Sequence, residues 1–131
     1  MKKELREKVW NKFKGHCAYC GKKIAYEDMQ VDHIVPCHHD LTAAQKRFIR
    51  ERQKEKKFVY PNIGSDDFDN LNPSCRRCNY HKSNLSLEDF RKVIQDKINV
   101  LNDSWHFKIA VDFGLIEIKE NVEVKFYFER L

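Results

Sequence analysis

The stretch Cys75-Arg76-Arg77-Cys78-Asn79-Tyr80-His81-Lys82 decides how this chain is expected to fold. It holds a C-x2-C knuckle, an asparagine directly after the second cysteine, and a lysine three residues further on. A second knuckle, Cys17-Ala18-Tyr19-Cys20, lies far upstream and is followed by Gly21, which lets the chain turn tightly. Two such knuckles can supply four thiolates to one tetrahedral Zn²⁺. The sequence therefore predicts a structural zinc site made by Cys17, Cys20, Cys75 and Cys78.

A redox dithiol and two unrelated cysteine pairs are the alternatives to a shared zinc ion. A redox pair is expected beside a thioredoxin-like βαβ segment, and the sequence shows none. The start of the chain has no apolar run of signal-peptide length, which predicts a cytoplasmic protein. In that reducing compartment cysteines bind metals more often than they form disulfides. The fifth cysteine, Cys37, is interpreted as a core thiol rather than a ligand.

Length and charge limit the protein class without choosing one function. The chain has 131 residues, which predicts a single domain over residues 1–131. Its 25 Lys and Arg against 20 Asp and Glu give a formal net charge of +5. This moderate excess is compatible with an anionic partner, and equally with a solvated surface of mixed charge. No segment approaches the roughly 20 apolar residues of a spanning helix, so no membrane partner is expected.

Polar residues that suit hydrolytic chemistry lie between and beside the knuckles. Asp32 and His33 come at the end of a predicted strand, residues 29–35, that Pro36 stops. Asp32 and Asn79 offer oxygen ligands to a hard divalent cation. Near such an ion, the neutral imidazole of His33 could deprotonate a water for attack on a phosphodiester. Asn70, just before the second knuckle, could accept from the His33 ring or brace its loop.

Each of these residues also has a simpler interpretation. A histidine beside an aspartate is commonly a surface pair, and Asn79 alone could be a helix cap. An Asn-Leu pair such as Asn70-Leu71 is usually a turn followed by a core leucine. Because all of them occur in this order between two knuckles, chance is a poor explanation of the pattern.

The ordered motifs resemble the HNH endonuclease family, of the zinc-stapled kind with a ββα-metal (His-Me finger) core. That family's motif runs C-x2-C, then Asp-His-Ile-x-Pro, then Asn-Leu-x-x-x-C-x-x-C-(His or Asn)-x-x-Lys. The matching positions here lie within residues 17–84, about half of the chain. The resemblance implies hydrolysis of phosphodiester bonds in DNA, expected to be double-stranded. By this resemblance, His33 is the general base and Asn70 orients the catalytic loop or His33. Asp32 and Asn79 would hold the catalytic Mg²⁺ or Mn²⁺, and the four cysteines would hold the structural Zn²⁺. Lys82 would lie near a substrate phosphate.

Two departures from the family pattern affect these expectations. Asn79 stands where the family often has histidine, and its amide oxygen favours a hard ion such as Mg²⁺ over zinc. The segment between His33 and Asn70 is long and predicts a helix-rich insertion at about residues 38–68. Three more histidines are kept as candidates for extra ligands or phosphate contacts: His38, His39 and His81.

The remaining sequence predicts an α+β fold. Periodicity predicts helices over residues 3–14, 41–57, 76–84 and 86–102, and it favours a helix over a strand for residues 104–113. Asp40 and Ser86 are the predicted N-caps of the second and fourth of these helices. The basic face of helix 41–57 is either solvated or in contact with the DNA backbone. Alternation in residues 122–128 predicts a strand that pairs with residues 115–118, so that 86–131 forms a helix and a C-terminal β-hairpin.

Three functions compete at this point. The first is a metal-dependent DNA endonuclease, which needs Asp32, His33 and Asn79. The second is a non-catalytic zinc-containing module that binds nucleic acid, which needs the cysteines and the basic face but not His33 or Asn70. The third is a toxin-like nuclease that a partner protein restrains. The C-terminal part could also serve as a homodimer interface or a DNA-reading surface.

Overall fold

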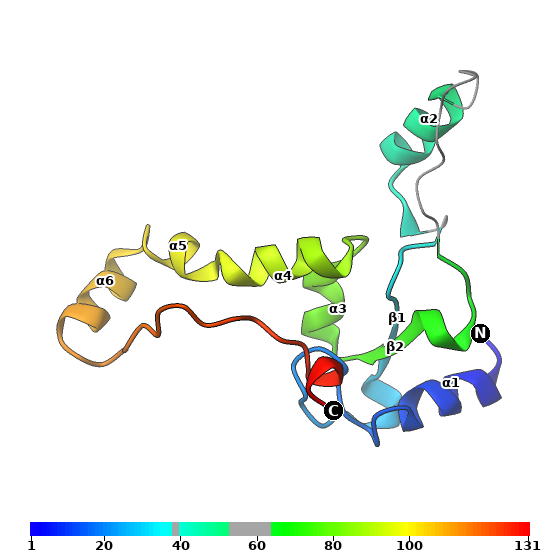
Figure 1. Ribbon diagram of the computed structural model, residues 1–131, viewed down its shortest axis with the longest axis horizontal. Helices are drawn as coiled ribbons and strands as arrows, with labels where there is room; N and C mark the ends of the chain where they lie inside the picture. Colours follow the sequence, from blue (N-terminus) through cyan, green and yellow to red (C-terminus); the bar gives the residue numbers. More distant parts are fainter. Residues whose placement is uncertain (38–39, 53–63) are drawn as a thin grey trace.

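The computed structural model describes residues 1–37, 40–52 and 64–131 (Figure 1). His38, His39 and residues 53–57 of the predicted basic helix therefore lie outside the described residues. The elements, in chain order, are α1 (Lys3–Asn11), a 3₁₀ helix (Tyr26–Asp28), β1 (Gln30–His33), α2 (Ala43–Arg52), a 3₁₀ helix (Phe68–Asn70), β2 (Leu71–Ser74), α3 (Arg76–Lys82), α4 (Leu87–Gln95), α5 (Lys97–Leu101), α6 (Trp105–Asp112) and a 3₁₀ helix (Tyr127–Arg130). The fold thus combines helices with one small antiparallel sheet, as the α+β prediction requires.

The sheet consists of two antiparallel strands, β1 and β2, placed between the two knuckles. Asp32 pairs with Asn72 and His33 pairs with Leu71. The first knuckle joins this sheet through the backbone, because the Ala18 N–H donates to the Pro73 carbonyl at 2.8 Å. Helix α3 follows β2 directly and packs against β1. The strand predicted from the Asp-His segment is thereby confirmed, with both strands tied to cysteine-bearing turns.

The core lies around the first knuckle rather than between large layers. Tyr19, within that knuckle, is buried and meets Phe90 of α4 and Phe126 edge-on, with ring centroids 5.6 and 5.2 Å apart. Phe90 and Phe126 stack at 5.3 Å. Aromatic pairs of this kind add about 0.5–1.5 kcal/mol each beyond their burial. Helix α1 closes the other side through the buried Val9.

The predicted C-terminal hairpin is wrong. Residues 114–131, all described, contain no strand, and in Figure 1 the segment returns from α6 toward the first knuckle alongside α4. Side chains of α4 replace the partner strand. Gln95 donates to the Val122 carbonyl at 2.6 Å and accepts from the Val124 N–H at 3.3 Å, and Arg91 donates to the Val124 carbonyl at 2.6 Å. The alternating pattern therefore belongs to an extended segment whose backbone hydrogen-bonds to side chains of helix α4, and not to a partner strand.

Several helix boundaries refine the sequence-based expectations. Ser86 caps α4 as predicted, accepting from the Asp89 N–H at 3.1 Å, and the predicted helix 86–102 is divided at Asp96 into α4 and α5. Helix α6 confirms the helical choice for residues 104–113. Asp40 is not the cap of α2. The Thr42 hydroxyl accepts from the Gln45 N–H at 3.2 Å, and the Gln45 side-chain oxygen accepts from the Thr42 N–H at 2.9 Å.

The outlying helices expose apolar and basic surface. Helix α2 lies in the predicted insertion and extends away from the sheet in Figure 1. Trp105, Phe113 and Leu115, in and after α6, are exposed. The dimer stays a prediction. Within the described ranges, the helices are all too short or too polar to cross a membrane.

We expect Gln95→Ala to release the C-terminal segment from α4 without unfolding the core. Gln95 holds two backbone groups of residues 122–124, and a hydrogen bond contributes about 0.5–1.5 kcal/mol. Amide exchange at Val124 should accelerate about tenfold, while exchange at Leu71 stays slow. Lys92→Ala, an exposed change on the same helix, serves as the control. Equal acceleration in both variants, or none in either, would contradict this tether.

Candidate functional site

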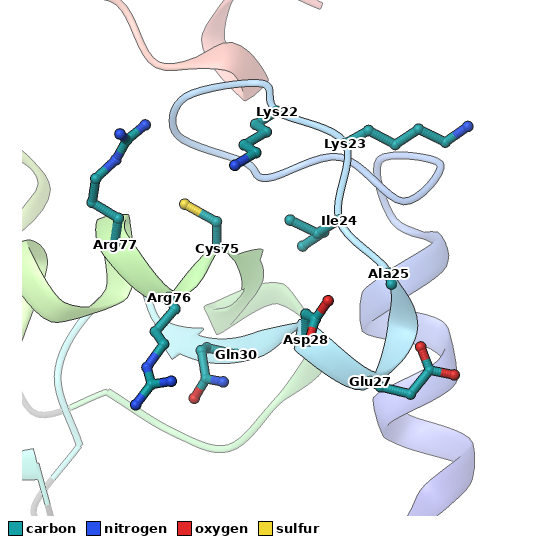
Figure 2. Close-up of a pocket in the computed structure, with 10 residues that line it drawn as sticks. All are labelled: Lys22, Lys23, Ile24, Ala25, Glu27, Asp28, Gln30, Cys75, Arg76 and Arg77. Carbon is teal, nitrogen blue, oxygen red and sulfur yellow. The ribbon is translucent and has the colours of Figure 1, made fainter.

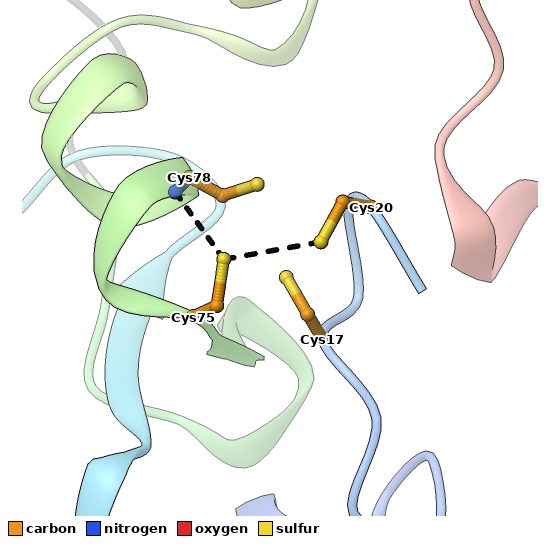
Figure 3. Close-up of side chains that lie close together, drawn as sticks. All are labelled: Cys17, Cys20, Cys75 and Cys78. Carbon is orange, nitrogen blue, oxygen red and sulfur yellow. Dashed lines mark hydrogen bonds between the residues drawn. The ribbon is translucent and has the colours of Figure 1, made fainter. Parts of the chain in front are cut away.

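The four knuckle cysteines converge into one cluster (Figure 3). Their sulfur atoms all lie within 4.8 Å of one another, although Cys20 and Cys75 are separated by most of the motif region. Local backbone turns shape both knuckles: Gly21 N–H donates to the Cys17 carbonyl at 3.0 Å, and Cys78 N–H donates to the Cys75 sulfur at 3.4 Å. The predicted meeting of the two knuckles is confirmed.

The cluster's dimensions and protonation fit a tetrahedral zinc site. Zn–S bonds of about 2.3 Å place tetrahedral sulfurs about 3.8 Å apart. The Cys20 and Cys75 sulfurs lie 3.8 Å apart. Hydrogen bonding from the Cys78 thiol, helped by backbone N–H groups, lowers the pKa of Cys17 to about 4, and the same contact raises the pKa of Cys78. A bound cation would replace the protons that these sulfurs share, so the four cysteines could hold a structural zinc ion.

Asp32 occupies a buried and fully engaged position at the centre of β1. It is 4% exposed and accepts from the Tyr19 hydroxyl and from Lys82, whose Nζ lies 3.2 and 3.1 Å from its two oxygens. Burial raises the pKa of Asp32, although the Lys82 charge acts in the opposite direction. Burial and the negative charge of Asp32 raise the pKa of Tyr19, which keeps its hydroxyl as a donor. The carboxylate is therefore held in one orientation from two sides.

Lys82 lies in the interior, which differs from the phosphate contact expected for it. Its side chain is 0% exposed. Besides Asp32, its Nζ donates to the His33 carbonyl at 2.8 Å. An ammonium group buried in this way can balance the carboxylate and fix the backbone of the Asp-His pair, but it has no exposed surface to offer a substrate. The physical reason is its place at the end of α3, which packs against β1.

His33 lies between two carboxylates that the sequence did not identify as site residues. Its Nδ1 is 3.2 Å from an Asp40 oxygen, and its Nε2 is 2.8 Å from an Asp66 oxygen. Asp40 was expected to cap a helix, and Asp66 to be part of a polar turn. Both belong to the long segment between His33 and Asn70. Their short distance from a histidine depends on how that segment folds back, so no local sequence pattern could have revealed it.

Asn70 braces the loop, and its side-chain hydrogen bonds go to backbone groups rather than to the His33 ring. Its side-chain oxygen accepts from the Val35 N–H at 2.9 Å. Its amide nitrogen donates to the carbonyls of Val35 and Ser65, at 3.0 and 2.8 Å. These bonds join the two ends of the long segment that begins after His33. Of the two roles expected for Asn70, the described contacts fit the loop brace.

Asp32, His33 and Asn79 open onto one pocket. This open pocket of about 370 Å³ lies between the end of β1 and the exposed side of α3. Its lining residues are Val31, Asp32, His33, Asp40, Asn79, Tyr80, Ser83 and Asn84. The predicted metal ligands and the predicted base therefore share one cavity. Asn79 reaches it because Cys75 and Cys78 fix the start of α3 next to β1.

A second, basic pocket lies at the other end of β1, beside the cysteine cluster (Figure 2). It has a volume of about 570 Å³, and Gln30, the first residue of β1, and Cys75 form part of its wall. Four exposed cations line it: Lys22, Lys23, Arg76 and Arg77. Glu27 and Asp28 also line it, yet within residues 1–37, 40–52 and 64–131 none of the four cations is in an ion pair. Sequence analysis missed this pocket because its two basic pairs belong to different knuckles.

Comparisons with known proteins add little to this geometry. No model of a protein family matches the chain, and no curated protein matches it. Among solved structures, the chain is similar to a crystal structure of the Type II-C Cas9 enzyme from Actinomyces naeslundii, at 26% identity and a TM-score of 0.45. The similarity covers 67% of this chain and 7% of that chain. A likeness of this size carries no argument about function, which must come from the site itself.

Removal of zinc should unfold the region between the knuckles. The cysteine cluster joins residues 17–20 to residues 75–78, and binding energy at such a site is also folding energy. We expect the purified protein to contain one zinc per chain and to lose its cooperative thermal transition when a strong chelator removes it. Cys20→Ser should lower the zinc content and the stability together.

Asn79→Ala is the matched comparison, because it changes the residue beside the cluster but none of the four sulfurs. It should keep a full equivalent of zinc by elemental analysis. A chain that contains no zinc and still melts cooperatively would contradict the structural assignment.

Proposed function

We propose that this protein is a metal-dependent DNA endonuclease of the HNH type, with β1, β2 and α3 as its ββα-metal core. The single observation that supports this most is the shared pocket of Asp32, His33 and Asn79. It combines two oxygen donors with an imidazole on one wall, next to a cysteine cluster that fixes the supporting helix. This is the constellation that metal-assisted phosphodiester hydrolysis needs.

The donor set of the pocket fits a hard divalent cation. Asp32 offers a carboxylate and Asn79 an amide oxygen, and such ligands suit Mg²⁺ or Mn²⁺. When bound, the ion would stabilise negative charge on the phosphate and on the leaving oxygen. Lys82 acts as a positioning residue: its charge favours the ionised form of the buried Asp32. Tyr19 holds the same carboxylate from the core side.

His33 would act as the general base that takes a proton from the attacking water. A neutral imidazole has one N–H and one lone pair. Donation from Nε2–H to Asp66, at 2.8 Å, leaves Nδ1 as the acceptor. Asp40, beside Nδ1, lines the pocket, whereas Asp66 does not, so Nδ1 is the nitrogen assigned to the water. Asp66 then fixes the ring tautomer, and Asn70 fixes the loop that carries Asp66 by binding Ser65.

The basic pocket supplies a surface for the phosphate backbone. It lies at the Gln30 end of β1, and the catalytic pocket lies at the His33 end, so one duplex backbone could follow the strand past both. Contacts to phosphate position a protein on DNA without reading its sequence. This same pocket favours the second function, a non-catalytic zinc module that binds nucleic acid, because it needs none of the residues around His33.

We expect His33→Ala to abolish Mg²⁺- or Mn²⁺-dependent nicking of supercoiled plasmid. Loss of a general base lowers rates about 10²–10⁴-fold. His106→Ala, an exposed histidine on α6 far from the pocket, is the matched control and should cleave like the parent. Zinc content and melting temperature should be unchanged in both. If neither the parent nor the control cleaves in any metal, while both bind DNA, the non-catalytic module is the better description.

The double variant Arg76→Ala/Arg77→Ala should weaken DNA binding in the absence of catalytic metal. Each lost phosphate contact reduces the slope of log K against log salt by about 0.9, so a change of about 2 is expected. Lys108→Ala/Lys119→Ala removes the same charge from the C-terminal part and serves as the control. Equal effects of the two double variants would show that only net charge matters and that the basic pocket has no specific role.

A further inference from the structure

Besides acting as the proposed base, His33 belongs to a second group of potential ligand atoms, whose third member, Cys37, has no role in the proposed nuclease chemistry. A ring nitrogen of His33, the Cys37 sulfur and an Asp66 oxygen all lie within 4.8 Å of one another. The sequence predicted Cys37 to be a core thiol rather than a ligand. The structure buries it, yet it places the sulfur against a carboxylate, since the thiol donates to Asp40 at 2.9 Å. Cys37 is therefore in polar surroundings beside the proposed base.

We propose that His33, Cys37 and Asp66 form an inhibitory site for a thiophilic divalent ion such as Zn²⁺. The proposal rests on the function proposed above, because its consequence is that a metal bound to the His33 ring prevents that ring from accepting a proton. Inhibition by a metal at this site would be separate from metal binding by the Asp32–Asn79 pair and by the four-cysteine cluster.

The donor set selects the ion. One thiolate, one imidazole and one carboxylate are all zinc ligands, and three protein ligands with a water in the fourth position also occur in catalytic zinc sites. Mg²⁺ avoids sulfur and prefers oxygen ligands, so it would stay at Asp32 and Asn79. The two neighbouring sites would then bind different ions, because one offers only oxygen ligands and the other includes a thiolate. The hard ion supports cleavage, and the thiophilic ion stops it.

The two carboxylates beside His33 can accept the ring proton in either of its tautomers, with the proton on Nε2 or on Nδ1. In the base-competent state, Nε2–H donates to Asp66 and the Cys37 thiol donates to Asp40. Metal coordination through Nε2 would shift the ring proton to Nδ1, where Asp40 accepts it across the observed 3.2 Å. The thiol proton is released as the thiolate binds the ion, and the Asp40 oxygen that accepted from the thiol can then accept from the ring N–H. A carboxylate that orients a metal-bound histidine in this way is a common feature of zinc sites.

The cluster is accessible to an ion from solution. The His33 side chain is 11% exposed, but the Asp66 side chain, which contacts its Nε2, is 74% exposed. A hydrated ion can meet Asp66 first and then exchange water for the deeper nitrogen and sulfur. The four-cysteine cluster is made by other residues, so the two zinc sites can be filled and emptied separately.

The test is calorimetric titration of Zn²⁺ into protein that already contains its structural zinc, without Mg²⁺ and under reducing conditions. The parent should bind one further equivalent and release protons. Cys37→Ser and Asp66→Asn should each weaken this second event at least about tenfold, in line with the cost of disturbing a zinc site. Asp69→Asn, an exposed neighbour outside the cluster, and Asn79→Ala should retain it. A parent that binds no second equivalent, or a Cys37→Ser variant that binds it equally well, overturns the proposal.

Cleavage separates this proposal from the proposed function. With Mg²⁺ present, added Zn²⁺ should suppress plasmid nicking by the parent, and Cys37→Ser should need at least about tenfold more Zn²⁺ for the same suppression. Equal suppression of both proteins overturns the inhibitory role. Absence of nicking at every metal concentration would refute the nuclease instead, and the calorimetric result would still decide whether the second site exists. Because Cys37 is buried, the exposed Asp66→Asn variant guards against a folding defect in Cys37→Ser.

Discussion

The meeting of the two cysteine knuckles is the constraint on which the other site geometry depends. Residues 17–20 and 75–78 come from opposite ends of the motif region, and only their convergence places β2 and α3 beside the first knuckle. The hydrogen bond from the Ala18 N–H to the Pro73 carbonyl also connects the first knuckle to β2 through the backbone. Once Cys75 and Cys78 are fixed, Asn79 has no freedom to leave the β1 side of α3. The position of Asn79, a proposed metal ligand, thus depends on a cysteine cluster that lies outside the pocket that Asn79 lines.

The buried pair of Asp32 and Lys82 is the second structural requirement, and it limits how the site can work. Removing one partner of a buried ion pair costs about 3–5 kcal/mol, because the other charge is left uncompensated. Lys82 thus stabilises the strand that carries Asp32 and His33, and it also keeps a negative charge available at the pocket. A divalent ion that binds Asp32 must share the carboxylate with this lysine. That sharing suits an ion that keeps several waters, as Mg²⁺ usually does.

Local sequence rules predicted the elements whose determinants are local. Ser86 caps α4, the knuckles turn at their glycine and cysteine positions, and the Asp-His segment forms a strand. Rules of this kind failed where a partner lies far away in the chain. The alternating residues 122–128 bond to side chains of α4 instead of a strand, and Lys82 is buried by its contact with Asp32. Asp40 and Asp66 reach His33 through a long segment whose path no periodicity describes.

The carboxylates on both sides of His33 explain why one ring could serve two opposed purposes. A neutral imidazole can donate to only one of them, so the state of the ring depends on which carboxylate takes the proton. Donation to Asp66 leaves the Nδ1 lone pair to accept from the proposed attacking water, and donation to Asp40 leaves the Nε2 lone pair for the proposed inhibitory metal. In the proposed inhibitory site, the Cys37 thiolate is the ligand that favours binding of a thiophilic ion at this ring over its hydrated state in solution.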